Sequence, residues 1–302
     1  MESVCKKSVI PLLYSRVIFT LTTESIMHNL EIFLQQPDDL PSLPEIYIKL
    51  SELLEDEDSD AYEIGEAVQA DPSLTARTLR TVNSAYYGLP NQVTTISQGV
   101  SLIGREQLQQ MLMGSVLAGM FKDRNIDSSF MWDFWHHSVK TAIIARHLAM
   151  QNARVLDHET FFTAGLLHDI GRLIIAEVAP ELWAEINDQV DNLDPNIVRI
   201  ETEKLGVSHI DVGAAIMKKW DMPDMLTQCL IKHHDVDHMG PDAISTSIVY
   251  LANQLSQHAL AEDEESMQEI LSTISNWQHS KCTLEQIYVA CQLADEQGLE
   301  LM

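Results

Sequence analysis

Cysteine, glycine, proline and basic side chains are all scarce in this chain of 302 residues. The four cysteines form no Cys-x-x-Cys pair and are too few for the disulfide framework of a secreted domain, so we expect a reducing, cytoplasmic setting. No uninterrupted apolar run reaches the roughly eighteen residues that a transmembrane helix needs. The 12 glycines and 10 prolines leave long stretches without a breaker, and such stretches favour helices over turns.

The charge of the chain is strongly one-sided. Lys and Arg number 19 and Asp and Glu number 45, which gives a net charge of −26. A surface of this sign repels polyanions, so we expect neither a nucleic-acid partner nor an anionic membrane partner. The hydrophobic fraction of 45% still allows a sizeable core, shared by one large or two modest domains.

Apolar residues recur mainly at spacings of three and four, which predicts an all-α fold. A polar stretch at residues 122–129 is expected to join an N-terminal helical part to a second helical part. Residues 1–26 are expected to be a disordered extension or an artefact of start-codon choice. The expected organisation is therefore an extension at 1–26, an N-terminal part at 27–125, a second part at 126–257 and C-terminal helices at 258–302.

Histidines gather in the second part of the chain, where nine of the twelve lie between His136 and His238. Asp133 and His137 are four residues apart on an expected helix, so both side chains lie on one face. Two further pairs follow, His168–Asp169 and His233–His234. Adjacent helical residues point about 100° apart, so each pair can converge on one point only where its helix ends. For the first pair, Gly171 is the expected terminator, while His209 stands alone ahead of a helix expected to start near Asp211.

These residue types are the ones that hold transition metals, although isolated histidines more often make hydrogen bonds in a core or lie at the surface. Imidazoles bind Zn, Fe, Mn or Ni, and a carboxylate such as Asp169 can bridge two ions roughly 3.5–4 Å apart. Such a pair lowers the pKa of bound water and clamps a phosphate oxygen, so the corresponding chemistry is phosphoester hydrolysis. A structural role, in which buried histidines fix helix ends, stays open. The histidines assigned to the ordinary class are His28, His147, His158, His238, His258 and His279.

Five motifs, in this order, resemble those of the HDOD family of bacterial signal-transduction proteins, which is related to the HD-type metal-dependent phosphohydrolases. The motifs are LPSLP at 40–44, QADPSLT at 69–75, NSAYYG at 83–88, GLLHDIG at 165–171 and WDMP at 220–223. The resemblance covers residues 40–255 and implies an all-helical fold with an N-terminal part packed against an HD-like part. It also implies that many such proteins act as regulators rather than enzymes.

The resemblance implies a ligand set for one or two divalent ions (Fe, Mn, Ni or Zn), although the site can also be empty. The implied ligands are His137, His168, Asp169, His209, His233 and His234, with Asp133 where some related phosphodiesterases place an extra carboxylate. Asn253 stands where the final aspartate is expected, and this replacement removes one negative charge. No Gly-Tyr-Pro motif follows the histidine pair, so cleavage of cyclic dinucleotides is not expected. The basic residues nearby are expected to be solvated surface: Arg172, Lys218, Lys219 and Lys232.

Two functions from different classes follow from these patterns. The first is a cytoplasmic regulator that binds a signalling protein or a small phosphorylated ligand and retains an altered metal site. The second is an active metal-dependent phosphohydrolase on a nucleotide or similar phosphoester. A groove between the two parts could serve the first function, lined by Asn83, Ser84, Tyr86 and Tyr87. The simpler expectation for these four residues is that they cap a helix and fill the interface between the parts.

Overall fold

The computed structural model describes residues 49–298 except positions 51, 55, 57, 71, 84–86, 88, 91, 122–125, 153–154, 156–157, 159, 190–195, 238–239 and 260. Every regular element in the described part is a helix and none is a strand, which confirms the all-α prediction. The expected extension at residues 1–26 lies outside the described residues. None of the described helices is long and apolar enough to cross a membrane.

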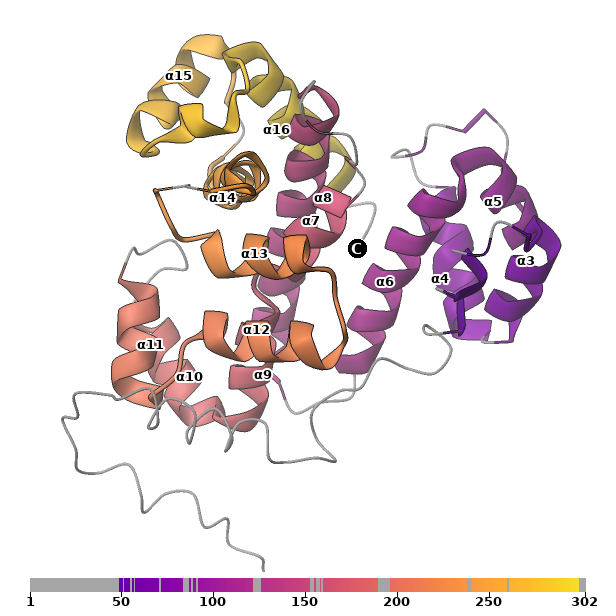
Figure 1. Ribbon diagram of the computed structural model, residues 1–302, viewed down its shortest axis with the longest axis horizontal. Coiled ribbons are helices and arrows are strands. Elements are labelled where there is room, and N and C mark those ends of the chain that lie inside the picture. The colour runs from indigo at the N-terminus through magenta and orange to yellow at the C-terminus, as the bar shows by residue number, and fades with distance from the viewer. Residues whose placement is uncertain are drawn as a thin grey trace, which may run out of the picture.

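The first described helices form the N-terminal part, which lies on one side of the molecule (Figure 1). They are α3 (Ala61–Gln69), α4 (Pro72–Val82), α5 (Ile96–Ile103) and α6 (Arg105–Phe121). Helix α3 begins after Asp60, whose carboxylate accepts hydrogen bonds from two amides of the first turn while Glu63 reaches back to the Asp60 amide. Gly104, with a φ of 89°, separates α5 from α6.

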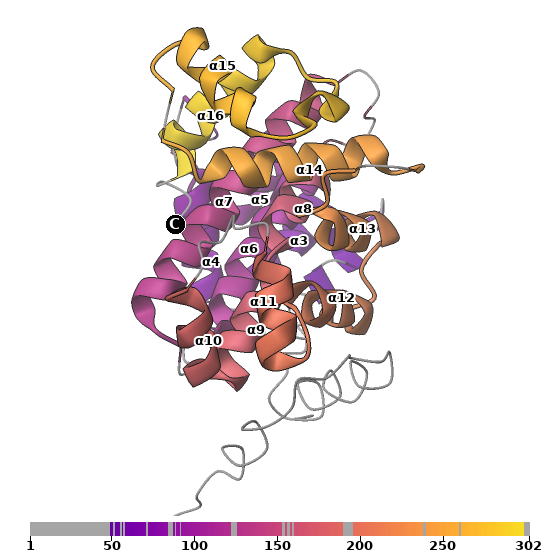
Figure 2. The ribbon, with the colours of Figure 1, turned by 90° about the vertical axis from the view of Figure 1, so that its left-hand side faces the viewer.

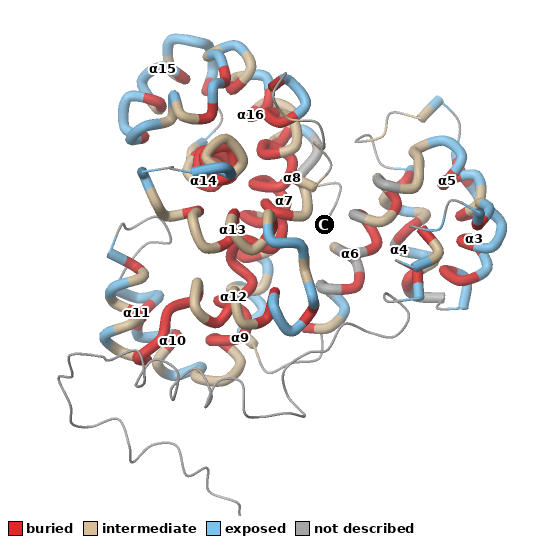
Figure 3. The backbone as a smooth tube through the Cα atoms, in the orientation of Figure 1, coloured by how far each residue is buried: buried red, intermediate tan, exposed pale blue. Residues whose placement is uncertain are grey.

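The long helix α7 (Ser128–Met150) is the axis of the larger part. Helices α8 (Thr160–Leu167), α14 (Ala243–Ser256) and α16 (Leu284–Gly298) pack against it. Its contact face is fully buried, as at Ile143 and Ile144, and Figure 3 shows the buried backbone concentrated along α7 and α8. The helix starts at Ser128 because the Asp127 carboxylate accepts hydrogen bonds from the amides of its first turn.

The remaining described helices surround this axis (Figure 2). On one side lie α9 (Ile170–Val178), α10 (Pro180–Asn187), α11 (Ile197–Leu205), α12 (His209–Lys219) and α13 (Asp224–Lys232). On the other lie α15 (Glu264–Thr273), which packs on α16, and the short 3-10 helix η2 (Trp277–Ser280), which packs on α14.

Two glycines allow the helices that carry the site to approach one another closely. A Cβ atom on Gly165 would lie 2.6 Å from the Cα of Ala142, so a glycine is needed where α8 crosses α7. A Cβ atom on Gly171 would overlap the carbonyl oxygen of His209 and lie 2.8 Å from the backbone nitrogen of Gly213. The crossing of α9 and α12 therefore also requires a glycine, and both crossings flank the connection between α8 and α9.

Candidate metal centre

Side chains from four separate stretches of the chain meet at one buried point. His137 comes from α7, His168 and Asp169 from the connection between α8 and α9, His209 from α12, and His233 and His234 from the end of α13. They form two sets that share Asp169, and within each set the ligating atoms lie within 4.8 Å of one another. We call these six residues the His/Asp cluster. One set is Asp169, His209, His233 and His234, and the other is His137, His168 and Asp169.

Asp169 stands between two pairs of imidazoles. Its Oδ2 atom lies 3.8 Å from Nε2 of His137 and 3.6 Å from Nε2 of His168. Its Oδ1 atom lies 3.2 Å from Nε2 of His233 and 3.5 Å from Nε2 of His209. A carboxylate whose two oxygens face different donor sets is suited to bridging two cations.

The His168–Asp169 pair reaches the cluster because the helix is interrupted at this point. Helix α8 ends before the pair and α9 begins after it, with Asp169 at φ −107° and ψ 10°. The sequence predicted the interruption, but its assignment to Gly171 was wrong. Gly171 lies inside α9, where it serves the close contact with α12.

His209 is the first residue of α12 rather than a residue ahead of it. The predicted start near Asp211 was late because Ser208 and Asp211 form a capping box. The Ser208 hydroxyl accepts a hydrogen bond from the Asp211 amide at 3.2 Å, and the Asp211 carboxylate accepts one from the Ser208 amide at 2.8 Å. The box fixes the helix start and thereby the direction in which His209 leaves the backbone.

Backbone carbonyls set the tautomers of two cluster histidines. Nδ1 of His168 lies 2.6 Å from the carbonyl oxygen of Gly165, and Nδ1 of His233 lies 2.5 Å from that of Leu230. A carbonyl oxygen can only accept, so each Nδ1 carries the proton and donates it. The Nε2 atoms of both rings are therefore left with a lone pair directed into the cluster.

The other two ring tautomers follow from side-chain acceptors. The Ser256 hydroxyl donates to the carbonyl oxygen of Asn253 at 2.8 Å, so it accepts from Nδ1 of His137 at 2.9 Å. Nδ1 of His209 donates to Oε2 of Glu201 at 2.6 Å. These two rings also direct an Nε2 lone pair into the cluster.

The four lone pairs face one another in two pairs, at distances where unprotonated nitrogens repel. Nε2 of His137 lies 3.0 Å from Nε2 of His168, and Nε2 of His209 lies 3.3 Å from Nε2 of His233. Protonation would relieve the repulsion, but burial lowers the pKa of His137 to about 4 and that of His168 to about 3. The rings of His137 and His168 are therefore neutral at neutral pH.

The carboxylate of the cluster is ionised as well. Burial alone would raise the pKa of Asp169, but the adjacent His168 imidazole and the Arg172 guanidinium hold it well below its usual value. Oδ1 of Asp169 and Nε2 of His234 are buried without a hydrogen-bond partner among the described residues. Neutral imidazoles and an ionised carboxylate with unused lone pairs are the donor set of a transition-metal site, so these residues fit a divalent ion.

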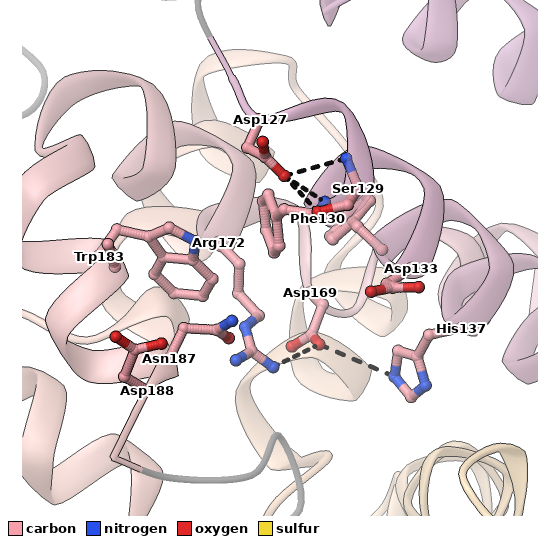
Figure 4. Close-up of a pocket in the computed structure, with 12 residues that line it drawn as sticks. Asp127, Ser129, Phe130, Asp133, His137, Asp169, Arg172, Trp183, Asn187 and Asp188 are labelled. Carbon is pink, nitrogen blue, oxygen red and sulfur yellow. Dashed lines mark hydrogen bonds and ion pairs between the residues drawn. The ribbon is translucent and has the colours of Figure 1, made fainter.

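A pocket of about 260 Å³ opens beside the cluster and is lined in part by His137 and Asp169 (Figure 4). Asp133, an expected ligand, lines this pocket on α7 and is exposed to solvent. It belongs to neither set of converging ligand atoms found among the described residues. Two further carboxylates line the same pocket, Asp127 and Asp188.

Arg172 was predicted to be solvated surface, and that prediction was wrong. Its side chain is buried, with a residue exposure of 1%. The guanidinium lies 3.3 Å from Oδ2 of Asp169 and stands over the ring of Trp183, 5.0 Å from its centroid (Figure 4). Burial of the cation is possible because a carboxylate and an aromatic face replace water around it. Lys218 and Lys219 are exposed, as expected.

Asn253 lies beside the cluster on α14 and is buried. Its Nδ2 atom donates to the carbonyl oxygen of His233 at 3.3 Å, so the amide nitrogen fastens the end of α13 to α14. The same helix supplies Ser256, the acceptor for His137, which sequence reasoning did not select.

The expected groove residues are described only in part, because Ser84 and Tyr86 lie outside the described residues. The Asn83 side chain donates to the carbonyl oxygens of Leu79 and Val93 and accepts from the Val93 amide at 2.6 Å. It therefore ties the end of α4 to the segment before α5. Tyr87 is half-buried and packs against the core. The groove itself stays a prediction.

Comparison with known proteins identifies relatives over most of the chain. A solved structure named "Putative phosphohydrolase" from Shewanella amazonensis SB2B is 26% identical, with a TM-score of 0.73 over 89% of this chain and 96% of that one. An HDOD domain protein of unknown function from Geobacter sulfurreducens is 21% identical, with a TM-score of 0.70 over 91% of this chain and 96% of that one, and shares the fold.

A curated relative, an uncharacterized protein of Treponema pallidum (strain Nichols), is 27% identical over 203 residues. That alignment covers 67% of this chain but only 39% of the relative. Residues 40–236 match the family described as HDOD domain, which is more than half of the chain. The chain therefore belongs to the HDOD family, as its motifs predicted.

Proposed function

We propose that this protein is a regulatory HDOD module of bacterial signal transduction that holds divalent metal in the His/Asp cluster. It acts by binding a ligand or a signalling protein rather than by turning over a substrate. The metal is the structural core of the binding site, and its type is Zn, Fe, Mn or Ni from the donor set.

The observation that carries this proposal is the charge of the pocket beside the cluster. Asp127, Asp133 and Asp188 supply carboxylates to its lining. The basic side chain in the lining is Arg172, and its guanidinium is already engaged by Asp169 and Trp183. Among the described lining residues, a phosphoester would meet three carboxylates and no basic side chain other than the engaged Arg172, which opposes both binding and transition-state stabilisation.

Asn253 supports the same proposal. An aspartate there would add a negative charge and a stronger oxygen ligand, whereas the amide adds neither. Its Nδ2 atom is used by the His233 carbonyl, so the side chain contributes to the packing of α13 against α14. Helix α14 therefore supplies no carboxylate ligand at this position, while the histidine ligands of the cluster are all present.

The test is turnover by metal-loaded protein on a panel of nucleotides and cyclic nucleotides. The reference is the His168→Ala, Asp169→Ala double variant, checked by circular dichroism for the same helix content. We expect wild-type turnover to equal that of the double variant, while metal raises the melting temperature of the wild type alone. Turnover of any panel substrate well above that of the double variant would contradict the regulatory proposal.

A second candidate is a phosphohydrolase, favoured by the position of Asp169 between two pairs of imidazoles. A bound metal pair supplies Lewis acidity and a nucleophilic water at neutral pH. In that case the chain's own contribution is to aim four Nε2 lone pairs and to hold Asp169 ionised beside Arg172. Neutralising the pocket with Asp133→Asn should then raise kcat/KM for an anionic substrate, and an unchanged value argues against this candidate.

The partner is proposed to be a separate signalling protein rather than a small phosphorylated ligand, because the pocket carboxylates oppose a phosphate group, and no nucleic acid is involved. The net charge of −26 supports the exclusion of nucleic acid. Co-purification from the native cell, with the double variant as the comparison, tests the protein partner. A protein retained by the wild type and lost with the double variant supports the proposal, whereas equal recovery with both counts against a role for the cluster.

A further inference from the structure

Glu201 is a carboxylate with no exposed surface, and it lies on α11 rather than on a helix that carries a cluster residue. Its Oε2 atom accepts two hydrogen bonds from His209, one from the backbone amide at 2.9 Å and one from Nδ1 of the ring at 2.6 Å. A single oxygen thus holds both the backbone and the side chain of the same residue.

Both contacts serve the orientation of His209. The backbone amide is the first of α12 and has no acceptor within its own helix, so Glu201 supplies one from a neighbouring helix. The ring contact keeps the proton on Nδ1 and directs the Nε2 lone pair toward Oδ1 of Asp169 at 3.5 Å and Nε2 of His233 at 3.3 Å. Without the carboxylate, the ring could rotate or adopt the other tautomer.

Glu201 also brings a negative charge close to the ligand set, which lacks the carboxylate expected at position 253. Asn253 takes the place of an expected carboxylate, so Asp169 is left as the ionisable acidic ligand in the cluster. Oε1 of Glu201 has no hydrogen-bond partner among the described residues, so part of its charge is not screened by donors. A carboxylate that accepts from a ligand imidazole raises the basicity of that imidazole toward a metal.

We propose that Glu201 is a positioning residue of the metal centre, which orients His209 through its ring and backbone and strengthens it as a ligand. This inference rests on the proposed metal-binding function. It assigns to the buried face of α11 a role that neither the family match nor the ligand spacing contains.

Three variants separate the orienting role from the charge. Glu201→Gln keeps an oxygen acceptor but removes the charge, Glu201→Ala removes both, and Glu203→Gln neutralises a neighbour that is exposed and paired with Arg199. The affinity of metal-free protein for Zn²⁺ is measured by competition with a chelating dye. We expect a loss of about 10- to 100-fold for Glu201→Gln, a larger loss for Glu201→Ala, and no change for Glu203→Gln. Wild-type affinity in Glu201→Gln would overturn the charge role.

A second measurement uses metal-free wild-type protein, so it does not depend on the folding of a variant. The ¹⁵N chemical shifts of the His209 ring in metal-free wild-type protein report which nitrogen carries the proton. We expect protonated Nδ1, and protonated Nε2 would overturn the positioning role. If the wild type binds no Zn²⁺ yet shows protonated Nδ1, the metal-binding proposal fails while the orienting contact stands, so the two failures are distinguishable.

Discussion

Nε2 of His137 lies 3.0 Å from Nε2 of His168, and hydrogen bonds at both Nδ1 atoms leave these two nitrogens with facing lone pairs. Such a contact is repulsive unless a proton or a metal ion lies between the atoms. Burial lowers the pKa of both rings to about 4 and about 3, so a proton is not retained at neutral pH. The folded chain therefore places two unprotonated nitrogen donors side by side, as a cation-binding site requires.

This relationship predicts that metal stabilises the native state. A ligand present at about 100 times its Kd and bound only by the folded protein adds about 2.7 kcal/mol to the free energy of unfolding. We expect Zn²⁺ or Mn²⁺ to raise the melting temperature and a chelator to reverse the rise. Calorimetry with and without the chelator checks this, and the His168→Ala, Asp169→Ala double variant should show no response. An equal rise in both proteins would mean that the ion binds elsewhere.

Arg172 is expected to contribute more to the free energy of unfolding in metal-free protein than in metal-loaded protein. The change Arg172→Met leaves Asp169 buried without its guanidinium partner, and removal of one member of a buried pair costs about 3–5 kcal/mol. Added metal restores positive charge beside Asp169 and should recover part of the loss. Urea denaturation with and without Zn²⁺ measures both quantities. The control Arg199→Met breaks an exposed pair with Glu203 and should cost less than about 1 kcal/mol.

Gly171 is expected to tolerate no side chain. The change Gly171→Ala would place a Cβ atom against the His209 carbonyl oxygen, forcing α9 and α12 apart at a cost of about 1–3 kcal/mol or more. The same displacement should separate Asp169 from His209 and weaken metal binding. The matched control is Gly99→Ala, whose Cβ atom would meet Val82 at an ordinary 3.6 Å. It should be neutral or stabilising by up to about 1 kcal/mol. Equal behaviour of the two variants would contradict the close crossing.

Stability should fall on acidification partly through His147 on α7. Burial, assisted by the charge of Arg146, lowers its pKa from 6.5 to about 4. Between these values the unfolded chain binds more protons than the folded one, so stability is fully present above pH 6.5 and is lost as the pH falls toward 4. One such proton contributes at most about 1.4 kcal/mol per pH unit.

The difference between the wild type and His147→Gln isolates this contribution, because the cluster histidines titrate alike in both proteins. We expect the wild type to lose stability more steeply than the variant between pH 6.5 and pH 4, measured by urea denaturation with chelator present. Parallel curves for the two proteins would show that His147 is not held neutral in the folded state.

The fold class could be predicted from helical periodicity, whereas the six cluster residues were selected together through the resemblance of the His and Asp motifs to the HDOD family. The partner that orients His137 could not be predicted, since Ser256 lies 119 residues away along the chain and on another helix. Arg172 was placed at the surface because the sequence does not show that Asp169 and Trp183 surround it.

One signal for Glu201 was present and unused. Ile197, Glu201 and Leu205 are spaced by four, and all three are buried on the same face of α11. A carboxylate within an apolar stripe has to find a partner inside the protein, and that partner is His209. A search for acidic residues at apolar positions would have selected Glu201 from the sequence.

Metal content tests the central claim most directly. Protein purified without chelator is analysed for Zn, Fe, Mn and Ni beside the His168→Ala, Asp169→Ala double variant prepared in the same way. The convergence of lone pairs on Asp169 predicts near-stoichiometric metal in the wild type and little in the variant. Equal and negligible metal in both proteins, unchanged after incubation with each ion, would contradict the assignment of the His/Asp cluster as a metal centre.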